Sequence, residues 1–311
     1  MIKTLIGIGY LVLCQAAAGL SLKPGADVPD LSAPYLGQPL PSRRAVVFAP
    51  GLVSTRENFE FSSTFSPDGG EFYFTRRGGD DRNTIYFSKR TPEGWTRPAI
   101  VSFSGEYADH EPSMFPDGRR IFWGSDRPLP DGNMKYKIWT ADRISSGWGP
   151  ARPLADPAGE DFLMYVTFTR EGAMYATGIV RSFLRDGKFQ RTVKLGPPVN
   201  DGYHNAHPYI DRDGRFLIFD SNRPGNFGRS DLFISFVDEK GEWSEPRNLG
   251  REINRGSWNS CPMVSPDDRF FFFSVDGDIF WMDALYLDAF RPKGESPQGG
   301  GPLRDGAATG G

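Results

Sequence analysis

The hydrophobic positions of this chain fall into short runs separated by polar, glycine-rich turns, and the pattern repeats. Its clearest element is a tight turn between two hydrophobic or aromatic segments. Five copies occur: FSPDGGEFYF from Phe65, FPDGRRIFW from Phe115, TREGAMYAT from Thr169, DRDGRFLIF from Asp211 and SPDDRFFFF from Ser265. With Gly69, Gly118, Gly172, Gly214 and Asp268 taken as equivalent, the copies are 49, 54, 42 and 54 residues apart. A repeat of this length built from strands predicts the blades of a β-propeller.

The residues of the turn explain why it forms a hairpin. Pro67 fixes φ near the value needed at the first central position, and Asp68 tolerates the second. Gly69 accepts the left-handed conformation that closes a bulged hairpin. In the fifth copy Asp268 stands where glycine is expected, and Asp is among the few other residues that visit this region at modest cost.

Each unit is predicted to contain four strands. The first precedes the turn and the second follows it, as in EFYFT from Glu71 and RFLIF from Arg215. A third strand, such as TIYFS from Thr84, ends in a glycine-containing turn with an aromatic residue, and a fourth strand runs outward. The aromatic residues of these turns are predicted to occupy one structural position and to pack between neighbouring blades: Trp95, Trp148, Phe189 and Trp243.

The fifth unit lacks a fourth strand, and the N-terminal region offers one. The segment VVFAP after residue 45 precedes the first turn in the way that fourth strands precede later turns. We expect this segment to complete the last blade and close the ring, which removes both sheet edges. Residues 44–290 give 247 positions, or about 49 for each of five blades. The predicted fold is therefore all-β, a five-bladed β-propeller with its last blade closed by the N-terminal strand.

The two ends of the chain differ in composition from the repeats. Residues 1–18 have a positive start, an apolar stretch and Ala16-Ala17-Ala18, as in a signal peptide, and the stretch is too short for a membrane span. A lipoprotein attached through Cys14 is disfavoured because Leu13 stands where a small residue is needed. We predict an N-terminal arm over 19–43, a disordered tail over 291–311, and a periplasmic or secreted protein.

Charge and cysteine content narrow the possible functions. The net charge of -3 and the pI near 5.7 give no general attraction to phosphate backbones, so no nucleic-acid partner is expected. After cleavage at Ala18, Cys261 is the remaining cysteine, and no intramolecular disulfide can form. We expect Cys261 to be a small core or channel-wall residue.

The repeats resemble the TolB-type WD40-like propeller family, whose blades carry S-P-D-G turns, an aromatic strand and a Ser/Asn-x-Arg step. The matching segments are SPDG at Ser66, SDRP at Ser125, SNRPGNFGRSDLFIS at Ser221 and WSEPRNLG at Trp243. The resemblance covers residues 58–285 and implies the propeller fold. It does not select a function, because such repeats occur in envelope proteins that bind partners, in peptidase-associated propellers and in carbohydrate-active enzymes.

The candidate site lies where the first strands begin, around the channel. Five residues lie seven positions before the equivalent turn residues Gly69, Gly118, Gly172, Gly214 and Asp268, and we expect all five to face the axis. They are Ser62, Glu111, Tyr165, His207 and Cys261. Slightly earlier lie further polar residues: Asp109, His110, His204, Asn205 and Asn259. Of these ten, we predict ligand binding by Asp109, His110, Glu111, Tyr165, His204, Asn205, His207 and Cys261.

Several chemistries are compatible with these residues. His207 and Glu111 could act as a base and acid pair, or together with His204 could hold a divalent metal. The simpler alternative is hydrogen bonding to channel water and loop backbone. Because there is no H-E-x-x-H motif, G-x-S-x-G elbow or phosphate-binding loop, we assign no catalytic residue, metal or cofactor. Arg127 and Arg223 are predicted to brace neighbouring loops.

Two functions remain. The first is an exported, non-enzymatic propeller that binds a protein or a cell-envelope glycan at its channel mouth. The second is a polysaccharide-active enzyme, a glycosidase or metal-assisted lyase, that uses the channel-mouth residues. A glycosidase needs two carboxylates at a defined separation, whereas the first-strand starts offer Glu111 and Asp109 from one blade.

Overall fold

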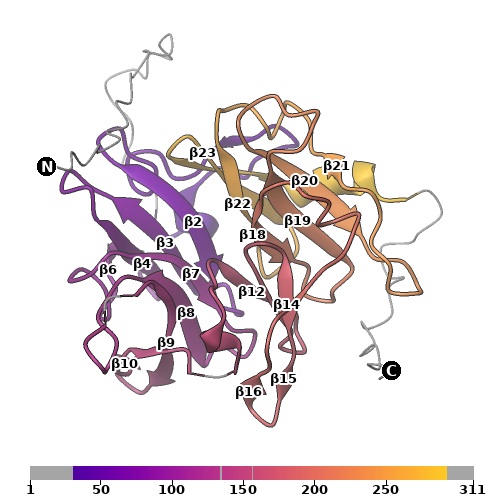
Figure 1. Ribbon diagram of the computed structural model, residues 1–311. Helices are drawn as coiled ribbons and strands as arrows, with labels where there is room; N and C mark the ends of the chain where they lie inside the picture. The colour runs from indigo at the N-terminus through magenta and orange to yellow at the C-terminus, as the bar shows by residue number, and fades with distance from the viewer. Residues whose placement is uncertain (1–30, 134, 156, 293–311) are drawn as a thin grey trace, which may run out of the picture.

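The computed structural model describes residues 31–133, 135–155 and 157–292. In this part of the chain, five antiparallel sheets are arranged around one axis as a five-bladed β-propeller (Figure 1). The predicted fold class is confirmed. The predicted signal peptide, the first part of the arm and almost all of the predicted tail lie outside the described residues.

The blades follow one another along the chain. Blade 1 contains β2 (Phe59–Phe65), β3 (Glu71–Arg77), β4 (Asn83–Thr91), β5 (Gly94–Trp95) and β6 (Ala99–Ile100). Blade 2 contains β7 (Asp109–Met114), β8 (Arg120–Ser125), β9 (Lys137–Ile144), β10 (Gly147–Trp148) and β11 (Arg152–Pro153). Blade 3 contains β12 (Val166–Phe168), β13 (Met174–Ala176), β14 (Val180–Ser182) and β17 (Val193–Lys194), with the side hairpin β15 (Leu184–Arg185) and β16 (Lys188–Phe189).

The remaining two blades complete the ring. Blade 4 contains β18 (Asn205–Ile210), β19 (Phe216–Ser221), β20 (Asp231–Phe236) and β21 (Arg247–Asn248). Blade 5 contains β22 (Asn259–Val264), β23 (Phe270–Val275), β24 (Asp278–Asp283) and β1 (Val46–Val47). The short helices η1 (Pro157–Glu160) and η2 (Ala284–Phe290) lie before blade 3 and after β24.

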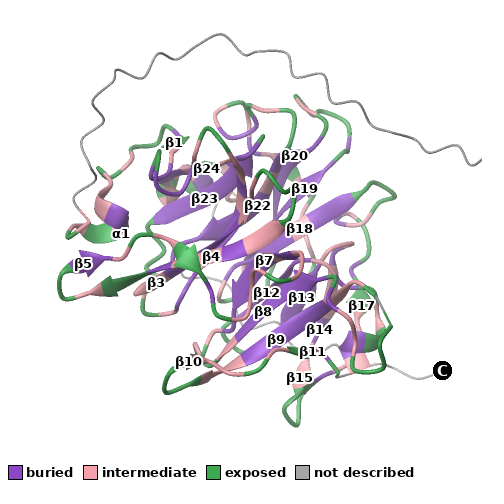
Figure 2. Cartoon of the chain, turned by 90° about the vertical axis from the view of Figure 1, so that its left-hand side faces the viewer, coloured by how far each residue is buried: buried purple, intermediate pink, exposed green. Residues whose placement is uncertain are grey.

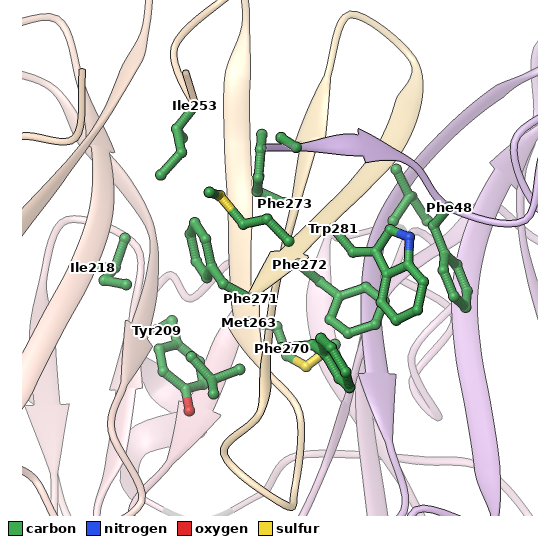
Figure 3. Packing of buried hydrophobic residues seen from close by; sticks show 14 of the residues in the cluster. Phe48, Tyr209, Ile218, Ile253, Met263, Phe270, Phe271, Phe272, Phe273 and Trp281 are labelled. Carbon is green, nitrogen blue, oxygen red and sulfur yellow. The ribbon is translucent and has the colours of Figure 1, made fainter. Parts of the chain in front are cut away.

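The N-terminal strand closes the propeller, as predicted. Val46 pairs with Trp281 and Val47 with Phe280, so β1 is the outermost strand of the sheet β1-β24-β23-β22 (Figure 2). Phe48 continues this contact by donating its backbone N–H to the carbonyl of Ile279 at 2.7 Å. Its ring is fully buried and packs edge-on against Phe72, Phe272 and Trp281. The closing segment therefore joins blade 5 to blade 1 through both backbone and side chains (Figure 3).

The five predicted turns have the expected backbone conformation. φ is 68° at Gly69, 69° at Gly118, 87° at Gly172 and 74° at Gly214. Asp268 adopts the same left-handed conformation, with φ of 58°. The aspartate is thus a substitute for glycine within an unchanged turn.

The aromatic residues after the third strands also occupy the predicted position. Trp95, Trp148 and Phe189 lie on the short strands β5, β10 and β16, and Trp243 forms a bridge with Val237. Trp148 of blade 2 donates its indole N–H to the hydroxyl of Tyr73 in blade 1 at 3.1 Å. This contact connects neighbouring blades.

The described part of the arm packs on the propeller. α1 (Pro34–Gly37) is a turn in which Tyr35 and Leu36 have positive φ. Leu36 is fully buried, and the Tyr35 ring packs edge-on against Phe65 of blade 1 and Phe270 of blade 5. The arm thereby covers the junction at which the ring closes.

Across the part of the chain that the structure describes, no helix is both long and apolar enough to cross a membrane.

Candidate functional site

The first strand of each blade lies innermost, and one residue in it or directly before it has a left-handed conformation. These residues are the five predicted to face the axis, and φ lies between 42° and 59° at all of them: Ser62, Glu111, Tyr165, His207 and Cys261. In four blades the pairing with the second strand shifts register there, as expected for a β-bulge. The five positions are therefore equivalent in backbone conformation.

Side chains of the neighbouring blade satisfy the backbone that the bulge leaves unpaired. The N–H of Glu111 donates to Oγ1 of Thr75 in blade 1 at 2.8 Å, and the N–H of Ser62 donates to Oγ of Ser274 in blade 5 at 3.1 Å. Thr75 and Ser274 occupy the same position of the second strand in their blades. The ring of bulges is thus held by contacts between blades.

His207 lies between two carboxylates that come from different blades. Its Nε2 is 3.2 Å from Oε1 of Glu111 in blade 2, and its Nδ1 is 2.7 Å from Oδ1 of Asp220 in its own blade. The other oxygen of Asp220 accepts a hydrogen bond from Ser230 Oγ at 2.9 Å. This chain of contacts fixes the orientation of the imidazole ring.

The surroundings shift the pKa of Glu111, His207 and the nearby Cys261. Burial alone would raise the pKa of Glu111, but the charges and hydrogen bonds of His110 and His207 outweigh burial and hold that pKa well below its usual range. Burial would lower the pKa of His207, but Cys261, Asp220 and Glu111 together raise it well above its usual value. Burial raises the pKa of the Cys261 thiol to about 12. At neutral pH we therefore assign an imidazolium beside an ionised Glu111 and an uncharged thiol.

Tyr165 closes the cluster on one side. Its ring lies edge-on to His207, with centroids 5.2 Å apart, and its hydroxyl donates to the carbonyl of Pro262 at 3.1 Å. Burial raises its pKa well above the usual value, so the phenol stays neutral. Tyr165 also lines a cavity on the side of the predicted turns.

Two other predicted residues support loops. Asp109 accepts from Arg127 at 2.7 Å and from the indole N–H of Trp123 at 3.0 Å, and it is fully buried. Asn205 accepts from Arg223 at 3.3 Å and donates to the carbonyl of Val199 at 3.1 Å. Both arginines also bond backbone carbonyls of the preceding loop. The predicted bracing role of Arg127 and Arg223 agrees with these contacts.

Two of the three histidines, His110 and His207, approach the Glu111 carboxylate, and His204 does not. His110 is largely buried, with its Nδ1 3.5 Å from Oε2 of Glu111. His204 is exposed in the loop before β18, whereas His207 points into the channel. The group of potential metal ligands that the described residues form is instead Glu111, His207 and Cys261.

Exposed aromatic side chains surround the same end of the channel. We call this end the loop face, because it is formed by the loops before the first strands and those between second and third strands. Among the described residues, the exposed aromatic side chains are Phe162, Tyr203, Phe227 and Trp258. All four belong to loops of this face, next to blades 3, 4 and 5.

The opposite end of the channel holds a cavity of about 120 Å³. It is lined by the second halves of the first strands and by the predicted turns, and its walls include Met114, Tyr209 and Met263 with Arg170 and Arg212. None of the residues that were predicted to bind a ligand, apart from Tyr165, lines this cavity.

Two features of the site were missed from the sequence. Asp220 stands in a hydrophobic second strand, where alternation alone does not reveal that it faces the channel. The sequence did indicate Asp220 through its position in the repeat. Asp220, Thr75 and Ser274 each lie six residues after the equivalent turn residue of their blade, which is Gly214, Gly69 or Asp268. The cavity had a signal too, because the repeated turn residues must converge at one end of a closed ring.

Comparison with known proteins finds similar solved structures and no matching family model or curated protein. No protein-family model matches the chain, and no curated protein matches it. Among solved structures it is similar to TolB from Acinetobacter baumannii, with 17% identity, a TM-score of 0.44, and coverage of 72% of this chain and 54% of that chain. This chain thus spans about half the length of that TolB.

Two further similar structures carry different names. A putative TolB from Agrobacterium tumefaciens has 18% identity and a TM-score of 0.42 over 73% of this chain and 77% of that chain. The Pseudomonas aeruginosa periplasmic gluconolactonase PpgL has 17% identity and a TM-score of 0.38 over 72% of this chain and 66% of that chain. The similar structures thus include TolB proteins and an enzyme, and they select neither binding nor catalysis for this chain.

Proposed function

We propose that this protein is an exported, non-enzymatic β-propeller that binds a protein of the cell envelope on its loop face. The observation that carries the proposal is the position of Phe162, Tyr203, Phe227 and Trp258, which are all exposed on the one face that surrounds the channel cluster. The large exposed side chains elsewhere in the described residues are aliphatic, and they are spread over the arm, the outer strands and the blade ends.

The chemistry of the face favours a protein partner. The guanidinium group of Arg251 lies 4.2 Å from the ring centre of Phe227, and that of Arg223 lies 5.9 Å from the ring centre of Tyr203. Aromatic residues and arginine are the side chains that most often contribute large parts of the binding energy at protein interfaces. A glycan could also stack on these rings, so it is the alternative ligand that the experiment must distinguish.

The polysaccharide-active alternative has less support. Glu111 and Asp220 are two channel carboxylates from different blades, which the sequence analysis did not foresee. A glycosidase, however, needs one carboxyl group that stays protonated as the acid. Glu111 has a lowered pKa and both groups contact His207, so this pair does not provide that acid.

Removing the exposed rings tests the binding proposal. Immobilised full-length protein is incubated separately with envelope proteins and with cell-wall glycan fragments, and the bound material is quantified. We expect protein capture to fall at least about tenfold in Trp258→Ala and Phe162→Ala, because losing such an anchor costs on the order of 2 kcal/mol. Ile100→Ala, at an exposed aliphatic residue of β6, should capture as much as the wild type.

Three results would contradict the proposal. These are equal capture by the ring variants and the wild type, binding confined to glycan, and turnover of the glycan. Export is tested on the same preparation by fractionating the cells and sequencing the N-terminus. A chain that is found in the cytoplasm and keeps residues 1–18 would exclude it.

A further inference from the structure

The cluster inside the channel has a second property that does not depend on the loop-face partner. Ligand atoms of Glu111, His207 and Cys261 all lie within 4.8 Å of one another, although the residues come from blades 2, 4 and 5, respectively, and are far apart in sequence. Glu111 and Cys261 are 4% and 2% exposed, and the His207 side chain is 22% exposed. Closure of the propeller thus places one oxygen, one nitrogen and one sulfur donor around a common point that can be reached from one side.

We propose that Glu111, His207 and Cys261 bind one divalent transition-metal ion, with Zn²⁺ as the best match. Zn²⁺ accepts thiolate, imidazole and carboxylate ligands together, whereas Ca²⁺ and Mg²⁺ require oxygen ligands. Ligand atoms of a tetrahedral zinc ion lie roughly 3.3 to 3.8 Å apart, given metal–ligand distances of about 2.0 to 2.3 Å. The 3.2 Å between Glu111 Oε1 and His207 Nε2 is close to this range, and small side-chain movements bring Cys261 to the same separation.

The surroundings of His207 match those of a metal-binding histidine. Its Nδ1 is 2.7 Å from Asp220, and Ser230 donates to the second oxygen of that carboxylate. A carboxylate on the far nitrogen fixes the tautomer and the ring orientation in most histidine–metal sites. Here it aims Nε2 at Glu111 and leaves that nitrogen as the ligand.

The second oxygen of Glu111 provides independent support. Among the described residues Oε2 accepts no hydrogen bond and has His110 Nδ1 3.5 Å away, although the Glu111 side chain is almost fully buried. Buried carboxylate oxygens are normally paired, because desolvation without a partner is unfavourable. A cation at the centre of the three ligands compensates the buried carboxylate.

Three protein ligands leave one position open. A zinc ion bound in this way has a fourth site for water or for a group of a ligand, as in sites where zinc contacts its substrate directly. The proposed ion would therefore lie at the base of the channel, below the aromatic loop face.

Metal binding by the full-length protein tests this proposal. A Cys14→Ser background leaves Cys261 as the single thiol. The metal-free protein is titrated with Zn²⁺ against a chromophoric chelator and, separately, with Co²⁺ while the absorption spectrum is recorded. We expect one equivalent of metal per chain, and a thiolate-to-cobalt charge-transfer band in the near ultraviolet.

Single substitutions distinguish the residues that bind the metal ion directly from residues that lie near it. Cys261→Ser should abolish the charge-transfer band, and Glu111→Gln should weaken Zn²⁺ binding at least about tenfold. Asp220→Asn should weaken binding by about 10- to 100-fold while keeping the band, as expected for a residue that orients a ligand. His204→Ala is the matched control, since this histidine lies in the same blade but is exposed, and it should bind like the background protein. Circular dichroism of each metal-free variant identifies any that fail to fold.

Measurements on the Cys14→Ser background protein alone can overturn the proposal. The test therefore does not require the other variants to fold. Absence of stoichiometric Zn²⁺ binding, or a Co²⁺ complex without a thiolate band, would exclude the site. The same conclusion follows if folded Cys261→Ser and Glu111→Gln retain full affinity, or if His204→Ala loses it.

Discussion

At the scale of single residues, backbone conformation identifies the equivalent positions of this repeat better than side-chain type does. Ser62, Glu111, Tyr165, His207 and Cys261 share neither size nor polarity, yet all have a positive φ in, or directly before, the first strand of a blade. Such conformations are unfavourable for residues other than glycine and persist where the surroundings fix them. Their different side chains therefore make the channel asymmetric within a regular scaffold.

Asp268 allows the cost of this conformation to be measured away from the channel. Asp268→Gly should raise the free energy of unfolding by about 0.5 to 1 kcal/mol, because glycine adopts a positive φ without strain. Burial also raises the pKa of this carboxyl group, so its removal relieves an unfavourable contact. Urea denaturation of the two proteins provides the measurement.

The reciprocal change is its control. A Cβ at Gly69 would meet no atom within 4 Å, so Gly69→Asp introduces the strain without a clash. It should lower stability by a similar amount. A loss of stability in Asp268→Gly would show that the carboxylate contributes more than the strain costs.

At the scale of the structural element, the repeated turns owe their stability to side chains as well as to glycine. Ser66 donates to Asp68 Oδ1 at 2.5 Å, and Ser265 donates to Asp267 Oδ1 at 2.6 Å. The same carboxylate oxygen of Asp68 also accepts the N–H of Gly70 at 3.0 Å. The S-P-D motif is thus a small hydrogen-bonded unit that precedes the second strand.

This unit makes stability depend on pH. The hydroxyl of Ser66 and the N–H of Gly70 lower the pKa of Asp68 in the folded protein. Its contribution is therefore present above the unfolded-state pKa, about 3.9, and is lost as pH falls through the folded-state pKa. Asp68→Asn should reduce stability at pH 7 by less than about 1 kcal/mol, because water screens an exposed carboxylate. The difference from wild type should vanish in strong acid.

A double-mutant cycle checks the cause. In a Ser66→Ala background the effect of Asp68→Asn at pH 7 should shrink, because the main donor is gone. Thermal unfolding of the four proteins at pH 7 and in acid measures both effects. Equal effects of Asp68→Asn with and without Ser66 would assign the pKa shift to the backbone alone.

The elements could be predicted well because their signals are local. Turn residues, alternating strands and the aromatic after the third strand repeat in sequence, and the structure reproduces them. Channel chemistry was less predictable. His204 and His207 are three residues apart, but only the second lies at the bulge, where the backbone turns its side chain inward. Asp220 joins it through pairing between β18 and β19, which the strand pattern does not specify.

At the scale of the whole molecule, closure of the ring by β1 was predictable from the number of strands in each repeat unit. The last unit lacked one strand, and the N-terminal segment supplied it. The packing of the arm across this junction was not predictable, since its proline-rich sequence has no periodicity. Phe48 combines these features. It lies next to β1, and its ring contacts both the first and the last blade.

Truncating Phe48 tests how far closure stabilises the ring. Phe48→Ala should lower the free energy of unfolding by about 3 to 5 kcal/mol, the range for removing a buried aromatic ring. Val46→Ala, two residues earlier at an exposed position of β1, should change stability by less than about 0.5 kcal/mol. Denaturant unfolding compares the two. Similar losses in both variants would mean that backbone pairing holds the closing strand and that the ring contributes little.

The pairing of Val46 with Trp281 also determines when the propeller can close during synthesis of the chain. These residues are 281 − 46 = 235 positions apart, so a ribosome must polymerise nearly the whole propeller before its earliest strand finds a partner. Until then the nascent chain has two open sheet edges, one at each end of the growing arc. Any truncation before residue 281 would leave both of them available to other chains.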